Sequence, residues 1–160
     1  MKDALKLRQL SFGVPAALIT SMALIVGLDA VTARKFAVVG GLLISGLADN
    51  LTDSLSVHIY QESERLPERQ AFRTTLANFT ARLAVSLSFV LLFLMLPTSV
   101  AISFCLFWGF LLLSGLSYLL ARERHQDAFS EVYKHAGVAV VVILVSKAIG
   151  LGIRSMTGSS

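Results

Sequence analysis

The chain has 160 residues, and only 15% of them are charged, against about 25% in an average soluble domain. Hydrophobic residues make up 55%, a composition that argues against a water-soluble globular domain. In a membrane chain the formal net charge of +4 reflects orientation rather than nucleic-acid binding, so no nucleic-acid partner is expected.

Five apolar stretches predict five transmembrane helices in contact with the lipid bilayer. They lie at residues 10–28, 36–57, 83–96, 99–121 and 136–153. The only charged residues inside them are Asp49, Asp53 and Lys147. A bilayer imposes this distribution, because a charge at its centre costs about 3 kcal/mol.

The first stretch predicts a membrane helix over about residues 10–31. Lys2, Lys6 and Arg8 precede it, as basic residues precede the core of a signal peptide, but the apolar run is too long for such a core. Pro15 stands near the start of the helix, where its missing amide proton is tolerated.

The remaining helices are expected over about residues 36–60, 76–96, 99–121 and 136–153, because about 20 residues cross the hydrocarbon of a bilayer. The third includes Arg82, whose long side chain is expected to reach back to the membrane surface. Pro97 disfavours helical geometry in the residue before it and so predicts a tight turn into the fourth helix. The expected fold is all-α, a single polytopic membrane domain of five transmembrane helices over residues 1–160.

Basic residues are distributed unequally between the two sides of this predicted bundle. One side carries ten of them, which are Lys2, Lys6, Arg8, Arg65, Arg69, Arg73, Arg82, Arg122, Arg124 and Lys134. The other side carries four, which are Arg34, Lys35, Lys147 and Arg154. Because basic loops remain in the cytoplasm, we expect a multi-pass protein with its N-terminus cytoplasmic and its C-terminus outside.

The second helix carries two intramembrane carboxylates. Asp49 and Asp53 are four residues apart, so both point to one side of a helix with about 6 Å between them. Ser45 and Ser56 continue this face, and a second polar stripe beside it consists of Asn50, Ser54 and His58. Two carboxylates facing lipid would be very unfavourable, so we expect them to face the bundle or a hydrated cavity.

This pattern predicts a metal-ion site. Helical rise places the two carboxylates in the inner half of the membrane, with His58, Glu62 and Glu64 at the inner surface. The candidate ligands are Asp49, Asn50, Thr52, Asp53, Ser56, His58, Glu62 and Glu64. Carboxylate, amide, hydroxyl and imidazole groups suit Mn²⁺ and Fe²⁺. Two adjacent carboxylates share a proton when no metal is bound, so metal entry would release protons.

Two alternatives remain open. In the first, the chain is a membrane scaffold that binds a partner through its charged loops, and the acidic pair is structural, with Lys147 as the obvious basic neighbour. In the second, it is a membrane enzyme, but the inner histidines and glutamates show no recognised ligand or nucleophile spacing. We therefore expect a non-enzymatic protein without a resident cofactor.

The first two helices resemble those of the vacuolar iron transporter family. The resemblance rests on residues 17–28 (ALITSMALIVGL), 39–42 (VGGL), 48–56 (ADNLTDSLS) and 61–64 (QESE). It implies a five-helix homodimer that exports Fe²⁺ or Mn²⁺ from the cytosol, commonly in exchange for protons, with Glu62 and Glu64 at the inner mouth. The chain departs from the family pattern at two positions: Ala16 stands where the family has an acidic residue, and Asp53 stands where it has a methionine.

Overall fold

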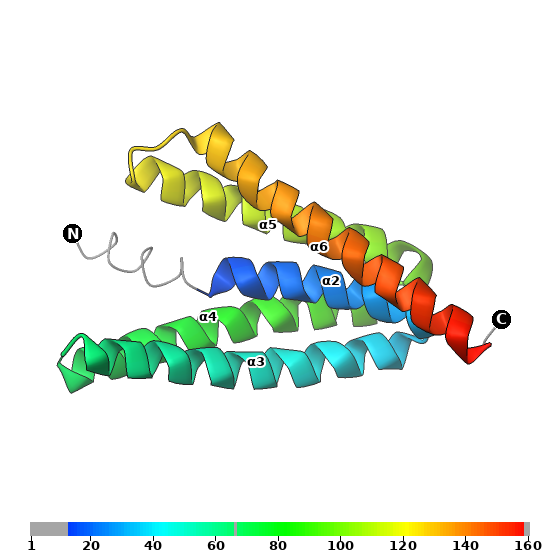
Figure 1. The fold of residues 1–160 in the computed structure, drawn as a ribbon, viewed down its shortest axis with the longest axis horizontal. Coiled ribbons are helices and arrows are strands. Elements are labelled where there is room, and N and C mark those ends of the chain that lie inside the picture. The colour runs from blue at the N-terminus through cyan, green and yellow to red at the C-terminus, as the bar shows by residue number, and fades with distance from the viewer. Residues whose placement is uncertain (1–12, 66, 159–160) are drawn as a thin grey trace.

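The computed structural model describes residues 13–65 and 67–158, which form five α-helices and no strand. In chain order these are α2 (Val14–Thr32), α3 (Lys35–Ser63), α4 (Glu68–Met95), α5 (Thr98–Glu123) and α6 (Ala128–Thr157). Successive helices run in opposite directions, so α2 begins at one end of the bundle and α6 finishes at the other (Figure 1). The expected all-α fold is confirmed, while residues 10–12 of the first predicted helix lie outside the described residues.

Prolines mark the helix boundaries as the sequence indicates. Pro15 occupies the first turn of α2, and Pro97 immediately precedes α5 after Leu96 leaves the helical conformation. The other boundaries differ from the expected ones, since α4 begins at Glu68 rather than near residue 76 and α6 spans Ala128–Thr157 rather than 136–153. Apolar runs locate the part of a helix that suits hydrocarbon, whereas the hydrogen-bonded helix continues beyond it into polar surroundings.

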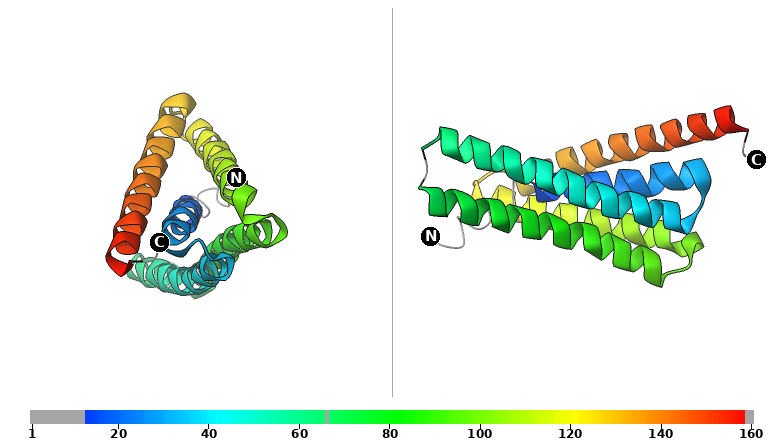
Figure 2. Two further views of the ribbon diagram at one scale, coloured as in Figure 1. Left: turned by 90° about the vertical axis from the view of Figure 1, so that its right-hand side faces the viewer. Right: turned by 90° about the horizontal axis from the view of Figure 1, so that it is seen from below.

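Helix α2 lies at the centre of the bundle. The end-on view shows it enclosed by the other helices, and it contacts all four of them (Figure 2). Its side chains Leu18, Met22 and Ile25 are fully buried and belong to one apolar core with Phe89 and Phe93 of α4. The most extensive helix pairs are α2 with α6 and α3 with α4, so the polar half of α3 lies against α4.

Four of these helices are long and apolar enough to cross a membrane, namely α2, α4, α5 and α6. Much of their apolar surface faces outward, and on α6 only Ala139 and Gly150 are buried. An outward apolar face suits lipid rather than water. Helix α3 is long enough as well, but the polar residues in its second half make it less apolar than the other four helices.

Small residues allow α2 and α6 to approach closely. A methyl group added at Gly150 would collide with the carbonyl oxygen of Gly27 and would lie 2.8 Å from Cβ of Ala30. Such contacts between backbones are a common basis of helix association in membranes, where no hydrophobic effect drives it.

Gly150→Ala is expected to destabilise the bundle by about 1–3 kcal/mol, because overpacking forces two backbones apart. The measurement is the thermal unfolding temperature of the detergent-solubilised protein. Gly152→Ala is the matched control, because a methyl group there meets nothing within 4 Å on the same helix. Equal unfolding temperatures for the two variants would contradict the close approach.

Candidate functional site

A buried arginine occupies the centre of the polar region between α2, α3 and α4. Arg82 of α4 is only 3% exposed. Its Nη1 donates to the carbonyl oxygen of Gly13 at 2.9 Å, its Nε donates to Oδ1 of Asn50 at 2.7 Å, and its Nη2 lies 2.5 Å from Oδ2 of Asp53. The expectation that Arg82 reaches back to the membrane surface is wrong, because three oxygen atoms inside the bundle bind its guanidinium group.

Close helix packing brings these partners together. The Cβ of Ser86 lies 2.9 Å from where a side chain of Gly46 would begin, so α3 and α4 nearly touch one turn from Asn50 and Arg82. At the start of α2, any side chain on Gly13 would collide with Asn78, and it would lie 2.6 Å from Cδ of Arg82. Glycine at both positions thus permits the approach that lets Arg82 bridge three segments.

The two carboxylates that were expected to act as a pair have different surroundings. Asp53 forms the ion pair with Arg82, and its side chain is 46% exposed. Asp49 is exposed and accepts a hydrogen bond from the Ser45 hydroxyl at 2.5 Å. Among the ion pairs of the described residues, none involves Asp49. One acidic group is therefore neutralised by a fixed partner, and the other is not.

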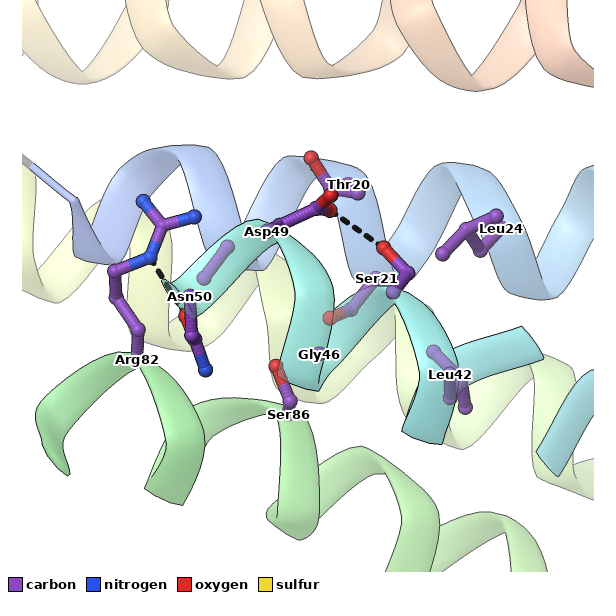
Figure 3. Close-up of a pocket in the computed structure, with 11 residues that line it drawn as sticks. Thr20, Ser21, Leu24, Leu42, Gly46, Asp49, Asn50, Arg82 and Ser86 are labelled. Carbon is purple, nitrogen blue, oxygen red and sulfur yellow. Dashed lines mark hydrogen bonds between the residues drawn. The ribbon is translucent and has the colours of Figure 1, made fainter. Parts of the chain in front are cut away.

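Asp49 extends from α3 toward α2, where Thr20 and Ser21 line the same small cavity (Figure 3). Ser45, Asn50, Arg82 and Ser86 complete its polar lining. The volume is about 10 Å³, roughly the space needed by one water molecule. Carboxylate and hydroxyl oxygens thus converge on a space the size of a single water or a dehydrated cation.

The other candidate ligands remain spread along α3. The hydroxyls of Thr52 and Ser56 donate to carbonyl oxygens of their own helix at 3.0 Å, and His58 Nε2 lies 3.5 Å from Glu62. Glu64 follows the last residue of α3 and is exposed. Over residues 13–65 and 67–158, no group of three or more His, Cys, Asp or Glu side chains gathers closely enough to hold a metal ion.

Lys147, the basic neighbour considered for the acidic pair, is exposed on α6 and enters none of the ion pairs formed by the described part of the chain. The arginine that does bind Asp53 lies on a polar stripe of α4 formed by Asn78, Arg82 and Ser86. Their spacing of four residues could have indicated this stripe from the sequence. Thr20 and Ser21 of the cavity carried no comparable signal, because α2 is apolar on all its faces.

A second cavity, of about 170 Å³, lies where α5 and α6 meet, and His135 is part of its lining. His135 Nδ1 lies 2.8 Å from the hydroxyl of Ser117, which itself donates to the Leu113 carbonyl oxygen at 2.6 Å. The serine hydroxyl thereby contacts both the backbone of α5 and the imidazole of α6, and this arrangement anchors α6 on α5.

Comparison of the chain with protein-family models, with curated proteins and with solved structures gives no match in any of the three. Its function is therefore inferred from its own residues and their geometry.

Arg82→Met is expected to lower stability by about 2–3 kcal/mol, because it leaves Asp53 and the Asn50 oxygen without their donor. The effect is smaller than for a fully buried ion pair, since the Asp53 side chain is 46% exposed. The double variant Arg82→Met/Asp53→Leu should recover part of the loss, because no unpaired charge remains. Unfolding temperatures in detergent measure both, and a double variant less stable than Arg82→Met would contradict the ion pair's role.

Proposed function

We propose that the protein is a homodimeric membrane transporter of divalent metal ions, Mn²⁺ or Fe²⁺, in which Asp49 binds the ion. The observation that carries the proposal is the contrast between the two acidic residues of α3. Asp53 is neutralised by Arg82, whereas Asp49 has no basic partner among residues 13–65 and 67–158 and faces a cavity lined by hydroxyl groups. A carboxylate kept free in such a place is typical of an ion site rather than of helix packing.

The charges near the cavity favour a cation. Asp49 and Asp53 contribute two negative charges and Arg82 one positive charge, which leaves one negative charge between α2, α3 and α4. In the low dielectric of a membrane protein such a charge attracts a cation strongly.

A fifth transmembrane span, α3, is part of this proposal. Ala33 and Arg34 alone connect α2 to α3, and α3 packs along α4. Its 29 residues give a length of about 44 Å, more than the hydrocarbon requires. The α3–α4 and α5–α6 connections lie at one end of the bundle, with Arg65, Arg69, Arg122 and Arg124 nearby, and this end is assigned to the cytoplasm.

In this proposal a second copy of the chain supplies the further metal ligands that one copy lacks. Asp49, Thr52 and Ser56 are exposed on one face of α3, and a carboxylate directly facing lipid is very unfavourable. The described residues of one chain gather no group of three acidic, histidine or cysteine ligands. Two copies joined through this face would cover the polar residues and bring two Asp49 side chains together.

The ligand chemistry supports a hard or borderline ion. Oxygen atoms of Asp49, Ser45, Thr20 and Ser21 surround the cavity or its edge, and sulfur is absent from its lining. Such oxygen ligands suit Mn²⁺ better than softer metals. At the cytoplasmic end of α3, His58, Glu62 and Glu64 would attract cations to the entrance, in keeping with the resemblance to vacuolar iron transporters.

Asp49→Asn is expected to reduce Mn²⁺ flux into proteoliposomes at least tenfold, because it removes the carboxylate that the described residues contribute to the cavity lining. The amide keeps the shape of the side chain, so folding should be retained. Glu123→Gln, at the end of α5, makes the same chemical change away from the cavity and should transport normally. Wild-type flux in Asp49→Asn would refute the proposal.

The second candidate is a non-catalytic scaffold whose acidic residues are structural, which the Asp53–Arg82 pair favours. A measurement of metal binding distinguishes the transporter from the scaffold. A transporter should gain unfolding temperature with rising Mn²⁺ concentration, because a ligand that binds only the folded state stabilises it. Asp49→Asn should lose this shift and Glu123→Gln should keep it; no shift in the wild-type protein favours the scaffold.

A further inference from the structure

The larger cavity lies at the end of the bundle where α5 connects to α6, away from the proposed ion site. Its volume is about 170 Å³, and its polar lining consists of Ser117, Arg124, Gln126, Glu131 and His135. Pro15 of α2 forms another part of the wall, because α2 begins at this same end of the bundle (Figure 1). This space is called the α5–α6 cavity below.

The arrangement of the helices creates the α5–α6 cavity. Helix α6 touches α2 where Gly27 meets Gly150, and it lies farther from α2 toward its own first residue (Figure 1). At this end α6 is held on α5 by the contact of 2.8 Å between the Ser117 hydroxyl and His135 Nδ1. Ser117 is only 2% exposed, so this wall of the cavity is fixed by the packing of the two helices.

The cavity contains two opposite charges that do not contact each other. Arg124 acts electrostatically on Glu131, yet it forms no ion pair with any residue of 13–65 or 67–158. Glu131 instead binds Lys134 at 2.7 Å, and the Lys134 side chain is 66% exposed. Exposed pairs of this kind contribute little stability, so a ligand can displace the lysine. The α5–α6 cavity therefore suits a ligand that carries both a negative and a positive charge.

The size and the polar groups of the cavity define this ligand further. A cavity of roughly 150 Å³ accommodates benzene, and a phosphate group with a two-carbon amine arm is of similar size. The Arg124 guanidinium group suits phosphate, because its N–H groups can donate to two phosphate oxygens at once. The Gln126 amide is a further donor, and the Glu131 carboxylate accepts hydrogen bonds from an ammonium group.

The depth of the α5–α6 cavity corresponds to the headgroup layer of a membrane. Its lining begins at Ser117, within the apolar stretch that ends at residue 121, and continues to Arg124 beyond it. Helical rise makes this distance about 10 Å. Tyr118 and Tyr133 are exposed beside the cavity, and tyrosine is enriched where a membrane meets water. A ligand that binds at this depth is a lipid headgroup.

We propose that the α5–α6 cavity binds the headgroup of a phospholipid that carries a primary amine. Arg124 and Gln126 bind its phosphate, as basic pockets between transmembrane helices do, and Glu131 binds its ammonium group. The acyl chains lie outside the cavity on exposed apolar residues such as Leu119 and Val138. A quaternary ammonium group has no N–H to donate to Glu131, so the site prefers phosphatidylethanolamine to phosphatidylcholine.

Native mass spectrometry of the detergent-solubilised protein tests this site. With the two lipids at equal concentration, the wild-type protein is expected to retain at least fivefold more phosphatidylethanolamine than phosphatidylcholine. Glu131→Gln should remove this preference, and Arg124→Gln should lower the retention of both lipids. Arg122→Gln is the matched control, because Arg122 lies over the Tyr118 ring and does not line the cavity. Equal retention of the two lipids by the wild-type protein, or equal losses in Arg122→Gln and Arg124→Gln, would overturn the proposal.

Free phosphoethanolamine distinguishes a lipid from a soluble ligand of the same chemistry. Added at the concentration of phosphatidylethanolamine, it should leave most of the bound lipid in place, because it lacks the acyl chains that contact α5 and α6. Displacement of most of the lipid would instead assign the cavity to a soluble ligand. None of these measurements requires ion transport, so the lipid site and the proposed function are tested independently of each other.

Discussion

The bundle depends on one buried guanidinium group. Arg82 joins the carbonyl oxygen that precedes α2 to the amide and carboxylate of α3, so a single side chain fixes three segments relative to one another. A positive charge in this position is tolerable only when its donors are occupied and a carboxylate balances it. The glycines at positions 13 and 46 make this possible, because a larger residue at either would prevent the approach.

The ion pair of Arg82 also gives the two acidic residues of α3 different surroundings. Asp53 is committed to Arg82, and Asp49 is left with a neutral hydroxyl partner. Two carboxylates one turn apart on the same helix therefore differ in charge balance and in their freedom to bind other ions. The difference arises from their neighbours on α2 and α4, since the residues themselves are chemically identical.

The sequence was sufficient for the approximate positions of the helices, though not for the first residue of α4 or the ends of α6, and for part of the site. Apolar runs and Pro97 located the bundle, and helical spacing correctly placed Ser45 beside Asp49 and grouped Asn50 with Ser54 on a separate face. The direction of Arg82 could not be predicted, because its flexible side chain reaches either the membrane surface or the interior. Only the packing of Gly13 and Asn50 around it decides between them. The contribution of Thr20 and Ser21 was equally hidden, because an apolar helix does not reveal which side faces its neighbours.

The central position of α2 has a consequence for biosynthesis. Of the described helices it comes first in the chain, yet it contacts all the others, including α6, the last. Synthesis proceeds from the N-terminus, so α2 is made before any of its neighbours. Its surface at Gly27, shaped for the backbone of α6, therefore stays uncovered until the final helix has emerged. The bundle can close only after translation of the whole helical region, and until then lipid or the insertion machinery must shield the helix around which the protein is built.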